Sequence, residues 1–278
     1  DLLCGKGSMK KCIGLCAFFY QIALLCAEAQ QLTSPPPFAQ LQAYSHHQPI
    51  IIATAAHPAS LTRNEFFGLA VYGERKFMLA ELSQYLAIGM VPAGAGRFGF
   101  QAGVFGNMSY GQTRAGIAYA RSIGKLDVGV RLNYFGFRTA GYGQTSTANG
   151  EAGMLLRLSE RFCAGINLFN PFGAGVLKDP SENLPSVYTA GFGYDVSKKF
   201  FLGAQLSKEG GVPLSLCAGM SYRPHESVVV RTGFSSPDGY YVGAGVQLRE
   251  YFLETVASWH PYLGLTPALS IQYLKLRR

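Results

Sequence analysis

The sequence predicts an all-β fold: a transmembrane antiparallel β-barrel of about 14 strands with a short N-terminal plug or cap segment. Three observations predict it. Apolar and polar residues alternate through most of the chain. Charged residues make up only 14% of it, against roughly 25% in an ordinary globular chain. Apart from one short stretch at the front, no apolar run approaches the ~20 residues that a membrane-spanning helix needs.

The alternation is clearest in residues 214–235, where aliphatic side chains take every second position and Gly, Ser, Cys or a single charge takes the others. A period of two residues is that of a β-strand with two different faces. In a membrane barrel the apolar face meets lipid and the small or polar face meets the lumen. A soluble β-sandwich also alternates, so the lumen-like composition of the polar face is what favours the barrel.

The front of the chain, residues 1–29, is interpreted as upstream residues followed by a cleaved signal peptide. Met9-Lys10-Lys11 is basic, residues 12–26 are apolar, and Ala27-Glu28-Ala29 has the small-x-small pattern of a cleavage site. Cysteines in the apolar stretch leave a lipoprotein signal open as the alternative. A signal peptide followed by barrel-type strands leads us to expect localisation to the outer membrane of a Gram-negative bacterium.

Residues 30–65 do not alternate and are predicted to form an N-terminal periplasmic or luminal segment. Three prolines at 35–37 exclude a strand there, and we expect the polar stretch 30–48 to be extended or loosely held. Residues 50–56 are expected to form one or two helical turns that end before Pro58. Exposing Ile50, Ile51 and Ile52 to water is unfavourable, so we expect this part to enter or cap the barrel from the periplasmic side.

Residues 66–278 are assigned to the outer-membrane β-barrel. The expected strands are 66–72, 79–91, 97–107, 114–121, 126–138, 148–158, 162–170, 187–196, 200–207, 214–223, 228–235, 240–248, 251–259 and 268–276. One set of connections is short and polar, as at 122–125 and 197–199. The alternate set is longer and rich in Gly, Pro and aromatic residues, as at 139–147, 171–186 and 260–267. Short periplasmic turns and longer outer loops are typical of outer-membrane barrels.

The polar positions of the alternation predict the residues that line the lumen. They are Gln101, Asn107, Asp127, Arg131, Asn133, Glu151, Arg157, Asn167, Gln205, Arg231 and Gln247, interleaved with many glycines. Charges of both signs favour a self-neutralising, hydrogen-bonded filling over a selectivity ring. The glycines leave volume that residues 30–65 can occupy. No cofactor or metal site is predicted.

Two further features limit the possible functions. Only Cys163 and Cys217 follow the leader, and we expect both to be free thiols in the wall, on the seventh and tenth strands. The net charge is +8, but Lys and Arg lie scattered at turns and strand ends, which argues against a nucleic-acid partner. The expected partners are outer-membrane lipid and either secretion-system proteins or a hydrophobic ligand.

A short motif supports a family resemblance. His57-Pro58-Ala59-Ser60-Leu61, directly before the first strand, resembles the Asn-Pro-Ala-x-Leu signature of the long-chain fatty-acid channel (FadL) superfamily, which includes the PorV-type proteins of type IX secretion in Bacteroidota. His57 stands where Asn is usual. The resemblance implies a fourteen-stranded barrel with His57, Pro58 and Ala59 as a plug motif near the lumen.

The leading functional hypothesis is a non-enzymatic, PorV-like barrel for transport across the outer membrane, with a role as an accessory of type IX protein secretion left open. The first alternative is a FadL-like channel for uptake of hydrophobic molecules. The second is a lipid-modifying barrel enzyme, for which Ser258, His260 and Glu254 are the candidate residues. A Ser–His pair must lie within hydrogen-bond reach to act, and we expect these residues instead to be interface residues without catalytic function.

Overall fold

The structure is a computed structural model that describes residues 35–173, 184–236 and 238–275. The expected signal peptide, residues 1–29, lies outside the described residues. Two short helices, α2 (Pro37–Gln42) and α3 (Ala53–Ala56), and the 3-10 turn η1 (Pro58–Arg63) precede the first strand. As expected from Pro58, α3 ends at Ala56, where the chain becomes extended at His57. No helix among these residues is long and apolar enough to cross a membrane.

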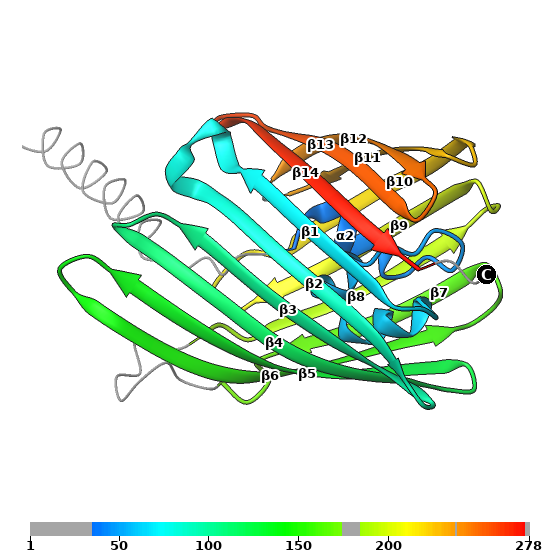
Figure 1. The fold of residues 1–278 in the computed structure, drawn as a ribbon, viewed down its shortest axis with the longest axis horizontal. Helices are drawn as coiled ribbons and strands as arrows, with labels where there is room; N and C mark the ends of the chain where they lie inside the picture. The colour runs from blue at the N-terminus through cyan, green and yellow to red at the C-terminus, as the bar shows by residue number, and fades with distance from the viewer. Residues whose placement is uncertain (1–34, 174–183, 237, 276–278) are drawn as a thin grey trace, which may run out of the picture. The chain divides into compact units, whose positions relative to one another are not determined.

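Fourteen strands close into one antiparallel barrel (Figure 1), because β1 pairs with β2 on one side and with β14 on the other. This confirms the predicted fold class. The strands are β1 (Gly68–Arg75), β2 (Ser83–Ala93), β3 (Gly96–Gly106), β4 (Tyr110–Ile123), β5 (Leu126–Thr139), β6 (Gly143–Arg157), β7 (Phe162–Phe169), β8 (Val187–Asp195), β9 (Phe200–Glu209), β10 (Ser215–His225), β11 (Val228–Ser235), β12 (Gly239–Leu248), β13 (Tyr251–His260) and β14 (Gly264–Leu274).

Side chains in β5 show how the alternation is used. Val130, Leu132 and Tyr134 are 52%, 68% and 51% exposed on the outer face, whereas Arg131 and Asn133 between them are 4% and 2% exposed. Since successive side chains of a strand point to opposite faces, the apolar set meets the bilayer and the polar set lies inside. The predicted faces of this strand are therefore correct.

The barrel has two rims that differ in their turns. We call the rim where β1 begins and β14 ends the near rim, and the opposite one the far rim. Near-rim turns are short and carry the polar sequences expected of them, such as the turns between β4 and β5 and between β8 and β9. Because both ends of the barrel lie at the near rim, we expect it to face the periplasm.

Two far-rim loops are shorter than expected. The region 139–147 was expected to be a loop, but β5 continues to Thr139 and β6 begins at Gly143. Likewise β14 begins at Gly264, inside the expected loop 260–267. Gly143 and Gly264 have φ values of 99° and 90°, a region that glycine adopts without strain, and this allows tight turns. The connection between β7 and β8 is long, as expected, and includes residues 174–183, which are not described.

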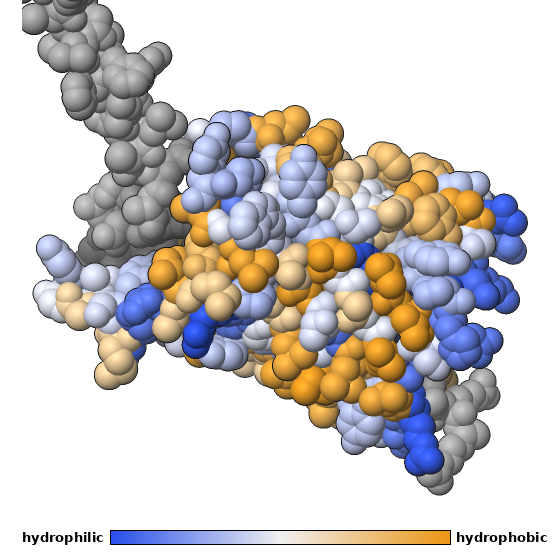
Figure 2. Space-filling model, turned by 90° about the horizontal axis from the view of Figure 1, so that it is seen from above, coloured by the Kyte–Doolittle hydropathy of each residue, from blue (hydrophilic) through white to orange (hydrophobic). Residues whose placement is uncertain are grey.

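Aromatic side chains pair on the outer face beside the near rim. Ring centroids are 5.1 Å apart for Phe98 and Tyr119 and 5.3 Å apart for Tyr251 and Tyr273. Similar contacts join Phe162 with Phe192 and Phe200 with Tyr222. Such rows mark the membrane–water interface of outer-membrane barrels. In Figure 2 hydrophobic residues cover much of the middle of the face in view, and hydrophilic residues gather at its right-hand end.

Candidate functional site

The lumen is the candidate site, because the residues that precede β1 lie inside it. Residues 35–64, called the luminal segment below, pass from α2, which contacts β8–β11, to η1, which contacts β3–β6. Phe38, Leu41, Tyr44, Ile51 and Leu61 are all at most 2% exposed. The stretch expected to be loosely held is residues 30–48, of which 30–34 lie outside the described residues. The described part, 35–48, is ordered and mostly buried, with His47 exposed. A largely polar sequence can be buried here because the wall offers hydrogen-bond partners.

Inward glycines form sockets for this segment. A Cβ atom on Gly153 would lie 2.6 Å from the ring of His57, one on Gly191 would lie 2.6 Å from Cζ of Tyr44, and one on Gly99 would lie 2.8 Å from Cδ2 of Leu61. At Gly129 it would meet the backbone of Pro58 and Ala59. Because distances under 3 Å are not tolerated by packed atoms, the segment can lie this close to the wall at these four positions only because the wall has no side chain there.

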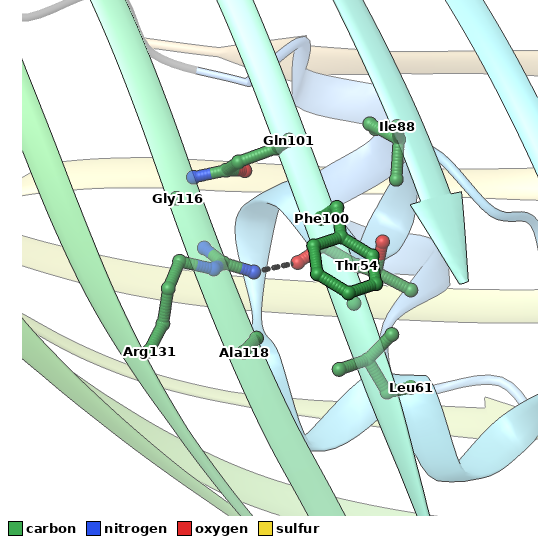
Figure 3. A pocket seen from close by; sticks show the side chains of 9 residues that line it. Thr54, Leu61, Ile88, Phe100, Gln101, Gly116, Ala118 and Arg131 are labelled. Carbon is green, nitrogen blue, oxygen red and sulfur yellow. Dashed lines mark hydrogen bonds between the residues drawn. The ribbon is translucent and has the colours of Figure 1, made fainter. Parts of the chain in front are cut away.

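The polar side of the lumen lies on β5–β7 and binds the segment through Arg131. Its guanidinium donates to the backbone carbonyl of Thr54, as Figure 3 shows. It also donates to the carbonyl of Ala55 and pairs with Glu151 at 2.9 Å. Glu151 also accepts hydrogen bonds from Asn167 at 2.8 Å and from Asn133 at 3.4 Å. The charge of Arg131 is therefore shared between the wall and the carbonyl end of α3, which favours a cation there.

A second ionic cluster lies close to the near rim. Asp127 accepts from Ser122 at 2.6 Å and lies 3.5 Å from Arg63 of the luminal segment and 3.3 Å from Arg157. Arg63 also donates to the thiol of Cys163 at 2.9 Å. Asp127, Arg131, Asn133, Glu151 and Asn167, all named from the sequence, thus belong to two neighbouring clusters that bind the segment.

Other residues on the inner wall were not identified from the sequence. Asp195 accepts from the hydroxyl of Ser45 and from the backbone of His46, both at 2.8 Å. Gln272 accepts from the backbone of Ile51 at 2.8 Å. Each occupies an inward position of its strand, so the alternation rule alone was sufficient to find them.

Arg231 and Glu254 form a buried ion pair on the opposite side of the lumen. Their side chains are 1% and 0% exposed. The guanidinium of Arg231 lies 5.9 Å from the ring of Phe38 in α2 and 5.7 Å from that of Phe252. Cation–π contacts of this kind are stronger when water is excluded. Arg231 therefore joins the first helix of the luminal segment to the wall.

The remaining predicted lumen residues are placed at different depths. Gln205 accepts from the hydroxyl of Tyr44 at 3.1 Å and donates to Gln40 at 2.8 Å, and Gln101 is buried beside Asn133. Gln247 is half-buried and donates to backbone carbonyls of the β12–β13 turn. Asn107, expected to point inward, is exposed in the β3–β4 turn, where its side chain accepts from two backbone amides.

The other side of the lumen is apolar. Ala70, Tyr72, Leu86, Ile88 and Met90 on β1 and β2 are at most 5% exposed and pack with Ile50–Ile52 and Leu61 of the segment. A cavity of about 10 Å³, enough for about one water molecule, lies where the polar and apolar sides meet. It is lined by Thr54, Leu61, Ile88, Gly99, Phe100, Gln101, Gly116, Ala118 and Arg131 (Figure 3).

The candidate residues for an enzyme have structural contacts of other kinds. Nδ1 of His260 accepts from the backbone amides of Tyr262 and Leu263 at 3.2 and 3.1 Å and so stabilises the β13–β14 turn. Glu254 pairs with Arg231 rather than with His260. Within the described ranges, no group of three or more His, Cys, Asp and Glu residues is arranged to hold a metal ion.

Both thiols of the barrel are expected to be unreactive in the folded protein. Cys163 on β7 and Cys217 on β10 are free, and they are 0% and 4% exposed. A thiol reagent should therefore modify them only after denaturation, without prior reduction. Time courses of labelling in detergent, with and without heat denaturation, measure this. Rapid labelling of either thiol in the folded state would contradict the burial.

Acidification is expected to loosen the luminal segment. Burial lowers the pKa of His57 from 6.5 to about 4, although Glu151 opposes the shift. Burial, and then the charge of Arg63, lower the pKa of His46 to about 4. When the segment is displaced, the imidazoles are exposed and regain their ordinary pKa of 6.5, so they take up a proton at a higher pH than the buried rings do. The neutral imidazoles of His46 and His57 therefore stabilise the buried segment fully above about pH 6.5. This contribution is lost as the pH falls from there through about 4.

Protease accessibility of the segment, measured across that pH range, tests this expectation. Cleavage of the wild type should become faster as the pH falls. A double variant with His46→Gln and His57→Gln should show a flatter profile. An equally steep profile in the double variant would assign the effect to other groups.

Comparisons with known proteins concern the fold. No protein-family profile and no curated protein sequence matches the chain. The crystal structure of the P. putida toluene transporter TodX is similar with a TM-score of 0.62 at 11% identity, over 88% of this chain and 99% of that one. The Ralstonia pickettii toluene transporter TbuX gives 0.60 at 11% identity, over 82% and 94%.

A Pseudomonas aeruginosa FadL homologue gives a TM-score of 0.55 at 11% identity, over 80% of this chain and 94% of that one. At these identities the similarity establishes a shared fold. A closed antiparallel barrel with an apolar outer face satisfies every backbone group within a bilayer. The chain is thus a β-barrel of the Gram-negative outer membrane with the fold of the FadL-type channels.

Proposed function

We propose that this protein is a non-enzymatic channel through which hydrophobic small molecules cross the outer membrane. The observation that carries the proposal is the apolar inner wall on β1 and β2, where Leu86, Ile88 and Met90 face the luminal segment. The interior of a general porin is polar and water-filled, and such a lumen needs no buried apolar side. The toluene transporters that share the fold support the same class of substrate.

The luminal segment has to move for this transport. It fills the space between the apolar and ionic sides, and the cavity beside Arg131 is only about 10 Å³. A hydrophobic substrate that inserts between the Ile50–Ile52 stretch and the wall of β1 and β2 replaces an apolar contact of the segment with one of its own. Its entry therefore has only a small free-energy cost. The ionic contacts of Arg131 and Asp127 then keep the segment attached on the opposite side.

Flux measurements in asymmetric proteoliposomes with a lipopolysaccharide outer leaflet test the proposal, because that leaflet slows apolar solutes that cross a phospholipid bilayer unaided. Reconstituted protein should increase the entry of labelled toluene but not of a labelled hexose. The variant Leu86→Ser, which places a hydroxyl on the apolar inner wall, should lower toluene entry. Ala87→Ser is the matched control, because Ala87 is the next residue and faces outward. Equal entry with and without protein would refute the proposal. Gel mobility before and after boiling verifies that both variants are folded.

An accessory role in type IX protein secretion of a Bacteroidota species is the second candidate. The motif His57-Pro58-Ala59 is compatible with it, because the superfamily whose signature the motif resembles includes the PorV-type proteins as well as the hydrophobic channels. His57 is 2% exposed and Ala59 is 0% exposed, so a protein partner would bind at a rim and not at the motif. Purification from outer membranes followed by mass spectrometry distinguishes the two functions: co-purifying secretion components support this role, and their absence together with toluene flux contradicts it.

A further inference from the structure

The outer wall carries a groove that the channel function does not use. It has a volume of about 560 Å³ and crosses β8–β12. Its lining is largely apolar and consists of Phe192, Leu202, Gly203, Ala204, Ala218, Gly219, Met220, Thr232, Gly233, Phe234 and Tyr240. Ala204 and Ala218 lie opposite each other on β9 and β10. They form a floor between larger side chains, so the groove is open toward the bilayer.

The groove exists because the wall lacks large side chains on both of its faces here. Gly193, Gly203, Gly219 and Gly233 lie in one hydrogen-bonded row across β8–β11 and point inward. The luminal segment covers this row from inside: a Cβ on Gly219 would lie 3.0 Å from Cδ1 of Leu41. On the outer face, no described residue covers the corresponding floor. The bilayer itself has to fill the groove.

The near-rim end of the groove is basic. Lys198 and Lys199 are exposed in the turn between β8 and β9. Lys199 is three residues from the groove residue Leu202, about 10 Å along an extended strand. The stacked rings of Phe162 and Phe192 mark the membrane interface beside this turn. An apolar groove that ends at two lysines at the level of the headgroups complements a lipid with acyl chains and a phosphate.

We propose that this groove binds one anionic phospholipid of the leaflet at the near rim. An acyl chain lies over Ala204 and Ala218, and the phosphate and anionic headgroup contact Lys198 and Lys199. A second copy of the chain is a less suitable occupant of this groove than an anionic lipid. Two copies packed through this face in one membrane would bring their lysines to the same side of the bilayer, where like charges repel.

Photo-crosslinking in vesicles tests the site directly. The full protein is reconstituted in phosphatidylcholine with a trace of phosphatidylglycerol that carries a diazirine on its acyl chain, and the labelled peptides are identified by mass spectrometry. Labelling should concentrate on β9–β11 rather than spread around the barrel. The variant Ala218→Leu, which fills the groove, should remove most of this labelling.

Ala115→Leu is the matched control, because Ala115 also lies opposite an alanine, Ala102, on the exposed outer face but outside the groove. It should leave the labelling unchanged. The double variant Lys198→Gln and Lys199→Gln should lower labelling by the anionic probe by roughly 25-fold, since each of the two basic side chains at an anionic surface contributes about a factor of five. Labelling by a phosphatidylcholine probe should not change in it.

Three results would overturn the proposal. Uniform labelling around the barrel would show ordinary lipid contact. Displacement of the probe by lipopolysaccharide but not by unlabelled phosphatidylglycerol would assign the groove to the other leaflet. Protein–protein crosslinks through β9–β11, in place of lipid adducts, would assign it to a second copy. Toluene flux does not enter this test, so the two proposals stand or fall separately.

Discussion

Replacing Gly129 by valine should displace the luminal segment and open the barrel. A Cβ on Gly129 would lie 2.7 Å from Cα of Ala59, and these neighbouring atoms are backbone, which cannot rotate away. Overpacking of this kind costs roughly 1–3 kcal/mol. Valine suits a β-strand, so we expect the strand to hold and the segment to move. In planar bilayers the variant should show higher conductance than the wild type, and a protease should cut the segment faster.

Gly150→Val is the matched control. Gly150 lies in the neighbouring long strand, β6, at an outward position, and a Cβ there would meet no atom within 4 Å. Its conductance should equal that of the wild type, and both variants should retain the mobility of a folded barrel on an unboiled gel. If Gly129→Val conducts like Gly150→Val while folded, the segment does not occlude the lumen.

Replacing Glu254 by glutamine should cause the largest loss of stability. The change leaves the guanidinium of Arg231, whose side chain is 1% exposed, without its carboxylate partner. Breaking a buried pair by removing one partner typically costs about 3–5 kcal/mol. The midpoint of urea unfolding, followed by the mobility of folded and unfolded bands, should fall accordingly.

Two controls separate the buried charge from other effects. Glu226→Gln changes an exposed acid in the turn between β10 and β11 and should leave the midpoint within error. The double variant Arg231→Met with Glu254→Leu removes both charges and should recover much of the lost stability, because replacing both partners by apolar residues is often neutral. A single variant as stable as the wild type would show that the pair is not isolated from water.

The strands were predictable because a membrane barrel repeats one simple constraint. In β5, expected at 126–138 and found at Leu126–Thr139, each residue has either a lipid-facing or a lumen-facing environment. The same rule found Asp127, Arg131 and Asn133. Composition is the weaker guide: the glycine-rich stretch 139–147 predicts a loop, whereas β5 extends to Thr139 and β6 begins at Gly143. Glycine there supports a tight turn between two long strands.

Contacts between inward side chains of different strands, and between the wall and the luminal segment, were not predictable in the same way. Arg231 and Glu254 lie on β11 and β13, with β12 between them, and a pair so placed depends on register. Gly243 lies opposite Arg231 and Gly245 lies opposite Glu254, so no side chain of β12 at these positions separates the two charges. Burial of the polar stretch 35–48 depends likewise on partners such as Asp195, more than a hundred residues away along the chain.

The position of the luminal segment constrains the order in which the molecule is assembled. The segment precedes β1, yet it contacts β3–β6 on one side and β8–β11 on the other. Closure of the barrel requires pairing of β1 with β14, the first strand with the last. Once that seam has formed, the wall surrounds residues 35–64 completely. We therefore expect the strands to gather around the segment while the seam is still open, so that the segment acts as the core on which the barrel is built.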